Sequence, residues 1–435
     1  MRKTLVNQRL IYDVKPIGMS SIFKETPEIS ANLLGQCLKL DTTEMYLDEQ
    51  KVFSNIFNNK IVYIPLIPLK FGEHYVRIKV NTIHGDLVQK SWCFLVENPE
   101  LEYNFYYGIP HAHTEYSDGI GTPIDAYEHA REKGLNFLVV TDHSNFLDGV
   151  KNHNYEYDRK TDQYIEKKNS EWYKTRIEAE TINSKYGDFL ALRGFEMSSS
   201  TGHINVINTS SYVEGKRQIK NSRKFFNWLY RQQNSVVAIN HPDKSFKRLF
   251  KVSNADEIVS VMEVGNGSYP HKYKNKEKYY FNALDMGWHV GAVNGQDNHL
   301  NNWGDSDNLT AIIAPYLSKE QFIQALRSRR TYSTETRSLK LIFKVNGYWM
   351  GSIINGNTHE KLNFQIIAED SNVPIKKIQL ISNNGKVLKE EIFDQVFIAN
   401  WCPSLKIGTK NSWYVVKIIH QDNRCAISSP IFFKI

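Results

Sequence analysis

The feature that most constrains the fold is an alternation of short apolar runs and helical stretches between residues 105 and 335. Continuous apolar runs of strand length are typical of strands buried on both faces, and helices between such strands are typical of a parallel sheet covered by helices. A barrel and an open doubly wound sheet are the two alternatives. The pattern predicts strands near 105–107, 136–142, 188–196, 203–207, 235–241, 258–264, 289–293 and 310–314, and helices near 123–133, 171–185, 219–233, 276–286 and 318–328.

The regions on either side have a different pattern, in which short strands alternate apolar and polar residues between turns. A chain of 435 residues is expected to form two or three domains. We therefore predict an N-terminal β-sandwich at 1–104, an α/β domain at 105–335 and a C-terminal β-sandwich at 336–435. The strands that carry this prediction are 60–67, 75–80 and 91–96 in the first region, and 339–345, 361–367, 377–381 and 413–419 in the last.

Metal-capable side chains follow the predicted strands of the central region. His111 and His113 are two residues apart, so on a strand their imidazoles lie on one face, and Asp118 follows in a turn. Because the carboxyl ends of barrel strands meet at one rim, donors far apart in the sequence would gather there. The alternative is a set of separately satisfied structural histidines. The other donors at such positions are Asp142, His143, Glu196, His203, His241, Asp297 and His299, and ten of the 14 histidines lie between 105 and 330.

These motifs resemble those of the polymerase-and-histidinol-phosphatase (PHP) superfamily of metallohydrolases. The chain departs from the family pattern before its last motif, which here reads Asn294-Gly-Gln-Asp297. The residues that carry the resemblance are His111-Ala-His113, Ser117-Asp118-Gly119, Thr141-Asp-His143, Glu196, Gly202-His203, His241-Pro242 and Asp297-Asn-His299. A further resemblance, to the branch that contains carbaryl hydrolase, is carried by Gly202-His-Ile-Asn205, Met262-Glu-Val-Gly-Asn266 and Ser328-Arg-Arg-Thr-Tyr332.

The resemblance implies a distorted (β/α)7 barrel that holds two to three divalent metal ions. Manganese, zinc and iron all suit nitrogen and oxygen ligands. The implied chemistry is hydrolysis by a metal-bridging hydroxide at a trinuclear site, with Glu196 as the bridging ligand and Asp142 orienting a ligand imidazole or a metal-bound water. By analogy, one ion is held by His111, His113, Glu196 and Asp297, a second by Glu196, His203 and His241, and a third by Asp118, His143 and His299.

The substrate is less constrained than the metal site. Lys244 is a candidate phosphate ligand or a solvated loop lysine, Tyr116 a candidate donor to the leaving group, and Asn266 a candidate rim residue. Glu263 either shapes the rim or is buried and paired. Two segments rich in lysine and tyrosine, 151–176 and 267–280, follow strand ends and are either nucleotide-binding loops or solvated lids.

The predicted function is a metal-dependent phosphoesterase, because a cationic pocket suits a small anionic phosphomonoester or phosphodiester. The alternatives are a nuclease on oligonucleotide ends, a carboxyl or carbamate ester hydrolase, and a binding or scaffold protein with a vestigial barrel. The net charge of +7 suits anionic partners, including nucleotides, but does not by itself indicate nucleic acid. The oligomeric state is left open.

The four cysteines and the absence of long apolar runs bear on location. No run approaches the ~18 residues of a membrane span, and the start of the chain lacks the apolar stretch of a signal peptide. These observations predict a cytoplasmic protein, although a mature exported form would have the same sequence. In a reducing compartment Cys37, Cys93, Cys402 and Cys425 are expected to be small buried apolar residues, and in an exported protein each terminal pair could form a disulfide.

Overall fold

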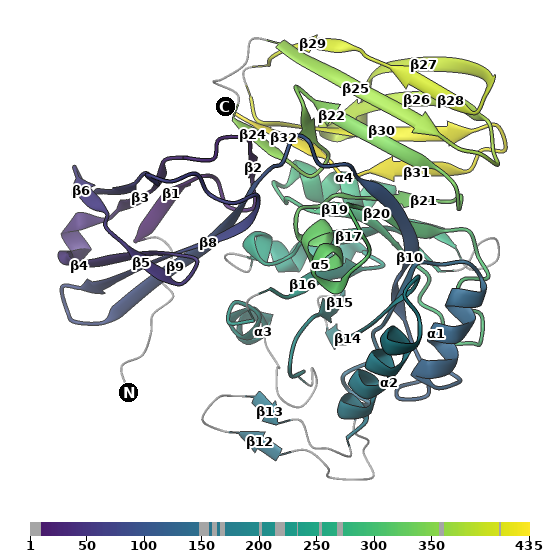
Figure 1. The fold of residues 1–435 in the computed structure, drawn as a ribbon, viewed down its shortest axis with the longest axis horizontal. Helices are drawn as coiled ribbons and strands as arrows, with labels where there is room; N and C mark the ends of the chain where they lie inside the picture. The colour runs from purple at the N-terminus through teal and green to yellow at the C-terminus, as the bar shows by residue number, and fades with distance from the viewer. Residues whose placement is uncertain are drawn as a thin grey trace. The chain divides into compact units, whose positions relative to one another are not determined.

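The computed structural model describes two compact units (Figure 1). The first comprises Met1–Leu101 with Ser352–Ile354, and the second comprises Glu102–Gly351 with Asn355–Ile435. The residues that the structure describes are 10–147, 156–158, 163–165, 170–199, 202–213, 222–232, 234–251, 255–267, 273–355, 361–408 and 410–435.

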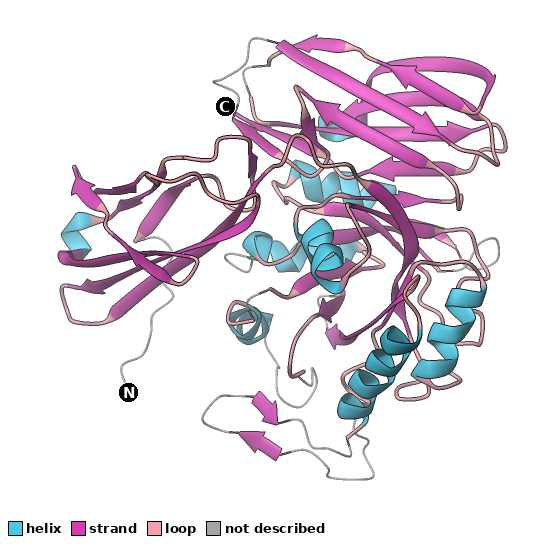
Figure 2. Ribbon diagram, in the orientation of Figure 1, coloured by secondary structure: helices cyan, strands magenta, loops and turns pink. Residues whose placement is uncertain are grey.

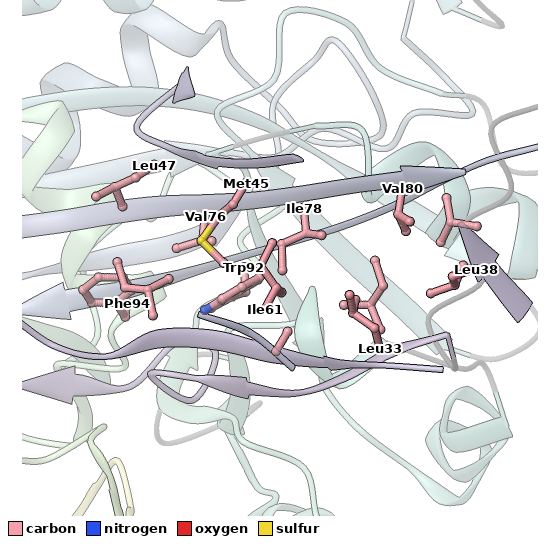
Figure 3. Packing of buried hydrophobic residues seen from close by; sticks show 14 of the residues in the cluster. Leu33, Leu38, Met45, Leu47, Ile61, Val76, Ile78, Val80, Trp92 and Phe94 are labelled. Atoms are coloured by element: carbon pink, nitrogen blue, oxygen red, sulfur yellow. The ribbon is translucent and has the colours of Figure 1, made fainter. Parts of the chain in front are cut away.

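The first unit consists of two β-sheets that enclose one apolar core (Figure 3). One sheet has the strand order β1-β3-β7-β6 and the other the order β2-β9-β8-β4-β5. Ile29 and Ile61 from the first sheet meet Met45, Ile78 and Phe94 from the second, all of them almost fully buried. The strands are β1 (Ile11–Lys15), β2 (Ser21–Ile22), β3 (Ile29–Leu33), β4 (Leu38–Leu47), β5 (Gln50–Val52), β6 (Asn55–Phe57), β7 (Lys60–Tyr63), β8 (Gly72–Thr82) and β9 (Leu87–Val96).

The second unit is built on a large mixed sheet, and the site residues follow its strands β10 to β19. Strands β10, β11 and β14 are parallel to one another, as are β16, β17 and β19. A parallel bridge between Ala112 and Asn298 then returns the chain beyond β19 to the end of β10. The strands are β10 (Asn104–Ala112), β11 (Phe137–Val140), β14 (Leu190–Ser199), β15 (Gly202–Ile207), β16 (Val236–Asn240), β17 (Val261–Asn266), β18 (Lys274–Asn275), β19 (Gly291–Gly295), β20 (Leu309–Ala314) and β21 (Thr331–Thr334).

The α/β class is confirmed, but the sheet is not the purely parallel one that we predicted. Strand β15 runs antiparallel to both β14 and β16, and β20 runs antiparallel to β10. The reason is local: only residues 200–201 separate β14 from β15, and so short a connection joins antiparallel strands, whereas parallel strands need a crossover. Sheet predominates over helix in this chain (Figure 2).

The five predicted helices are confirmed. Thr122 and Asp125 form a capping box at the start of the first helix, with Pro123 in its first turn. This helix contacts β11 and the second helix contacts β14, so both cover strands that lead into the site. The helices are α1 (Pro123–Glu132), α2 (Glu171–Lys185), α3 (Ser222–Leu229), α4 (Glu277–Asp285) and α5 (Lys319–Arg327).

The C-terminal strands belong to the same compact unit as the α/β region, except for β24, most of which is grouped with the first unit. Strand β21 pairs with β31, so the sheet continues from β20 through β21 into β31, β30, β26 and β27. The separate domain at 336–435 stays a prediction. The C-terminal strands are β22 (Lys340–Val345), β23 (Tyr348–Trp349), β24 (Ile353–Asn355), β25 (Lys361–Glu369), β26 (Ile375–Ser382), β27 (Lys386–Val396), β28 (Ile398–Trp401), β29 (Ser404–Lys406), β30 (Ser412–His420), β31 (Cys425–Ser428) and β32 (Ile431–Lys434).

Three smaller expectations have clear outcomes. All four cysteines are free thiols, but only Cys93 is buried and Cys402 is exposed, so the expectation of four buried thiols was wrong. Among the described residues, no helix is both long enough and apolar enough to cross a bilayer. Of the first lysine- and tyrosine-rich segment, 151–176, the structure describes only β12 (Glu156–Asp158), β13 (Gln163–Ile165) and the residues from 170 onward. Residues 268–272 of the second segment, 267–280, also lie outside the described residues.

Candidate metal centre

The nine predicted donors come together at one end of the sheet, around the carboxylate of Glu196. This side chain is fully buried at the middle of β14, and both of its oxygens face imidazoles. Its Oε1 lies 3.5 Å from His111 Nε2, 3.2 Å from His203 Nδ1 and 3.4 Å from His241 Nε2. Its Oε2 lies 3.4 Å from His113 Nε2 and 3.0 Å from His143 Nδ1. One carboxylate therefore contacts two different groups of histidines.

A first set of donors converges beside Glu196. The Nε2 atoms of His111 and His113 are 3.1 Å apart. The Oδ1 atom of Asp297 lies 3.3 Å from the former nitrogen and 3.1 Å from the latter. Together with Glu196, these are the four residues that the resemblance implies for one ion.

A second set lies further out and is more exposed. Asp118 Oδ1 is 3.3 Å from His299 Nε2, and Asp118 Oδ2 is 3.7 Å from His143 Nε2. His113 adjoins this set, so that it stands between the buried and the exposed donors. The side chains of Asp118 and His299 are 42% and 36% exposed, against 1% for Glu196, so this side of the centre is open to solvent.

The remaining set differs in part from the predicted one. His143 and His203 have ligand atoms within 4.8 Å of each other and of Glu196, so His143 is shared between this group and the outer one. His241, the predicted partner of His203, reaches Glu196 and stands edge-on to the His203 ring at 4.8 Å.

The buried carboxylates of the centre and His111 shift one another's pKa values. Burial opposes the ionisation of Glu196 and Asp297, but the charge on His111 outweighs it and holds the pKa of both carboxyls well below their ordinary values. Burial alone would lower the pKa of His111, and the neighbouring carboxylates Asp297, Glu196 and Glu263 instead raise it well above its usual value.

The centre fits divalent ions on two observations. Glu196 Oε2 is buried, and no described donor meets it with hydrogen-bond geometry, even though His143 Nδ1 is close. The second observation is that His111 Nε2, His113 Nε2 and Asp297 Oδ1 lie within about a hydrogen-bond length of one another. No more than one of these three atoms needs to carry a proton, so hydrogen bonds alone do not account for all of their contacts. Neutral nitrogen and anionic oxygen donors in this arrangement suit zinc, manganese or iron.

Glu263 is buried and paired, which was one of the two alternatives left open by the sequence, and its main partner is a predicted metal ligand. It is buried on β17, and its Oε1 accepts a hydrogen bond from His111 Nδ1 at 2.7 Å. Its Oε2 accepts from the backbone N–H of His241 and, at 2.9 Å, from Asn266 Nδ2. A carboxylate behind a ligand imidazole fixes which ring nitrogen is free to bind a metal. The sequence did contain a signal for Glu263, because it lies near the end of the predicted strand 258–264, as the predicted metal ligand Glu196 lies at the end of the predicted strand 188–196.

Asp142 bonds directly to the turn after β10, and its predicted part in orienting an imidazole or a metal-bound water stays a prediction. Its Oδ1 accepts from the backbone N–H of Thr114 at 2.7 Å and from Ser117 Oγ at 2.6 Å, and its Oδ2 accepts from Thr114 Oγ1 at 2.7 Å. It thus holds the turn that carries Asp118. It reaches an imidazole only through Ser117, whose Oγ lies 3.4 Å from His113 Nδ1.

The substrate roles of Tyr116, Asn266 and Lys244 stay predictions, and the structure gives the surroundings of each. The Tyr116 hydroxyl donates to Glu178 on α2, and Asn266 is bonded to Glu263, so both are occupied within the protein. Lys244 is exposed at the start of a short 3-10 turn (Lys244–Lys251), just after His241.

Two donors have a backbone conformation that non-glycine residues rarely adopt. The φ angle is +26° at His241 and +53° at Asp297. Such conformations cost roughly 1–3 kcal/mol and persist where surrounding contacts impose them. Around Asp297 those contacts are the hydrogen bonds from Asp297 N to His111 O and from His113 N to Asn298 O, which tie the loop after β19 to β10.

Comparisons with known proteins add little to this geometry. No protein-family model and no curated protein matches the chain. A two-domain protein from Bacteroides vulgatus, described as containing a predicted PHP-like metal-dependent phosphoesterase, is 16% identical, with 77% of this chain and 97% of that chain covered and a TM-score of 0.42. An amidohydrolase from Chromobacterium violaceum is 14% identical over 44% of this chain and 87% of that chain, with a TM-score of 0.27. Likenesses at these scores do not establish a shared family.

Proposed function

We propose that this protein is a metal-dependent hydrolase of phosphate esters. The observation that carries the proposal is the Glu196 carboxylate, whose Oε1 faces His203 and His241 and whose Oε2 faces His113 and His143. That is the arrangement of a carboxylate shared between two metal ions. We further propose that His111, His113 and Asp297 complete one ion, His203 and His241 a second, and Asp118, His143 and His299 a third, within a distorted seven-stranded barrel closed at Ala112 and Asn298.

The charge of a loaded centre favours a phosphate ester over a neutral ester. Three divalent ions carry six positive charges, against three carboxylates among the donors and a fourth, Glu263, behind His111. About two positive charges would remain, and a phosphoryl group with its negative oxygens would neutralise them. Bound ions of this kind supply a water of lowered pKa and neutralise charge on a phosphoryl oxygen.

Three residues that are not predicted metal ligands would then hold those ligands in place. Glu263 and Asn266 hold His111 and the loop of His241, and Asp142 holds the turn that carries Asp118. The exposed side chains of Asp118 and His299 mark the side from which a substrate would enter.

The test is a substrate panel run with added manganese, zinc or iron, with the metal content measured on the same samples. The panel contains p-nitrophenyl phosphate monoesters and diesters, nucleotides, short labelled oligonucleotides, and carboxyl and carbamate esters. Turnover of small phosphate esters is the expected result, and turnover of oligonucleotide ends would extend it to a nuclease. Hydrolysis of carboxyl or carbamate esters alone, or a protein that binds no metal, would contradict the proposal.

Two variants and a matched control place the activity at this centre. His299→Ala removes an accessible donor, and His111→Ala removes a buried one; both should lose metal and activity while the fold is retained. His129→Ala changes a histidine on α1 that pairs with Asp305 outside the centre, and its activity should equal that of the wild type.

A further inference from the structure

A β-bulge in β17 brings a second residue to the face of Glu263. Pairing with β19 shifts between Glu263 and Gly265, so one residue of β17 is unpaired there. A bulge turns the following side chains relative to the regular alternation. Asn266, three residues after Glu263, consequently bonds to the same carboxylate instead of facing away from it.

One lysine on the strand that pairs with this end of β17, and another just after that strand, follow next in the chain. Strand β18 is antiparallel to β17, with Lys274 opposite Asn266. Directly opposite residues of an antiparallel pair have their side chains on the same face, so Lys274 lies on the face of Asn266. The next lysine, Lys276, donates its backbone N–H to Val264 O at 2.6 Å, and its charge acts on Glu263 and on Asp243 in the loop after His241.

The residue before Lys274, Tyr273, also holds this part of the chain against β17. Tyr273 packs over Gly265 so closely that its Oη lies 2.2 Å from the place where a Cβ would be. Tyr273 is largely buried there and interacts with Glu335. The residue before the lysines is therefore fixed against β17, and a side chain larger than hydrogen at 265 would displace it.

The two lysines are not neutralised within the described residues. No described carboxylate forms an ion pair with Lys274 or Lys276. The two carboxylates whose charges act on Lys276 bond to other groups: Glu263 to His111 and Asn266, and Asp243 to Ser245 N–H. Lys276 is half-buried, and burial together with the charge of Lys274 lowers its pKa. Partial burial and the charge of Lys274 both disfavour the charged form of Lys276, and an anion bound beside the two lysines would offset both effects.

We propose that Lys274 and Lys276 form a second anion subsite beside the metal centre, so that the preferred substrate is a phosphate ester carrying another anionic group, such as a second phosphate. The inference builds on the proposed function: the metal centre would hold the phosphate that is cleaved and the lysines the group that is not. The link between them is short, since Asn266 is opposite Lys274 and is joined through Glu263 to His111.

The experiment compares a matched pair of substrates, a hexose 6-phosphate and the corresponding hexose 1,6-bisphosphate, by phosphate release with metal added. The wild type should have the higher kcat/KM on the bisphosphate, mainly through a lower KM. In the double variant Lys274→Gln/Lys276→Gln the ratio of the two kcat/KM values should fall by about tenfold, the factor expected for one lost charged contact of ordinary strength. Lys274→Arg/Lys276→Arg should restore most of the preference.

The matched control is Lys319→Gln, an exposed lysine at the start of α5, just beyond the end of β20 that pairs with the beginning of β10, away from His111. It should leave the ratio unchanged, and metal content should be at the wild-type level in every variant. Phosphatase activity without a preference for the bisphosphate, or a preference that survives in the double variant, would overturn the lysine subsite and leave the proposed function standing. Absence of phosphate release from both substrates by the metal-loaded wild type would overturn both.

Discussion

Glu263→Gln is the most informative single substitution, because it changes one atom of the carboxylate behind His111 and almost no volume. The two oxygens of Glu263 accept three hydrogen bonds, from His111 Nδ1, from His241 N–H and from Asn266 Nδ2. A glutamine has one oxygen and one NH2 group, so it cannot satisfy all three donors.

Either orientation of the new amide has a cost. If the NH2 group faces His241 and Asn266, donors face donors. If it faces His111, Nδ1 must become the acceptor, so the proton moves to Nε2, the nitrogen that faces His113 and Asp297. That nitrogen is then unable to bind a metal. Loss of such a supporting partner typically reduces metal affinity by about 10–100-fold, which corresponds to about 1.4–2.8 kcal/mol.

The assay is a chelator-competition titration of the metal, together with thermal unfolding of the metal-free protein. We expect weaker binding of one ion, with the other binding steps less affected, and a lower kcat/KM. Glu132→Gln, at an exposed position of α1, is the matched control. Wild-type metal affinity in a folded Glu263→Gln protein would refute the role assigned to this carboxylate.

Three further predictions concern Gly295, Glu196 and the buried Asp370–His420 pair. Gly295→Ala should reproduce part of the Glu263→Gln defect, since a Cβ at 295 would lie 1.8 Å from Glu263 Oε1; unchanged metal affinity would show that the carboxylate can move without consequence. Glu196→Gln should lower the affinity for more than one ion, because both oxygens face donors; a titration that loses a single ion would argue against a bridging role. Asp370 is buried beside His420, Nε2 to Oδ2 3.1 Å; burial opposes its ionisation, but His420 and the hydroxyls of Ser338 and Thr336 hold its pKa well below the usual value. Its stabilising contribution is therefore complete above about pH 4 and is lost as pH falls through the lower folded-state value. Asp370→Asn should lower the free energy of unfolding by about 3–5 kcal/mol at pH 7. Denaturant titrations of both proteins should show this difference becoming smaller at acidic pH, and a difference that does not change with pH would contradict the stabilising role assigned to the Asp370 carboxylate.

The sequence predicted the elements of the fold better than their directions. The helices, and the strands that lead to His113, Glu196 and His241, follow from apolar periodicity, which is a local property. Periodicity does not encode direction, and the two-residue connection that makes β15 antiparallel lies between runs that look alike. The continuation of the sheet from β21 into β31 was also hidden, because it depends on a pairing between residues almost a hundred positions apart.

The donors were predictable because strand ends converge in any barrel-like sheet, so the identity of the residue at each strand end is informative. Supporting roles were less predictable. Asp142 and Glu263 are both carboxylates next to donors in the sequence or the sheet, and only the folded geometry shows that Glu263 bonds to an imidazole whereas Asp142 bonds to a turn. Lys276 was indistinguishable in the sequence from the other lysines of its segment, and the bulge in β17 that places this segment leaves no mark in the periodicity.

The continuous sheet has a consequence for how this enzyme candidate can be cut or recombined. Ser429, near the C-terminus, bonds through Oγ to the backbone N–H of Ala292 on β19, the strand that leads to Asp297. Removing everything after 335 would therefore remove this hydrogen bond to the strand before Asp297 and leave β21 paired only with β20, with the backbone groups of its other edge unpaired. The last hundred residues of the chain cannot be treated as a detachable accessory, and any shuffling of modules between related proteins must carry both parts of this unit together.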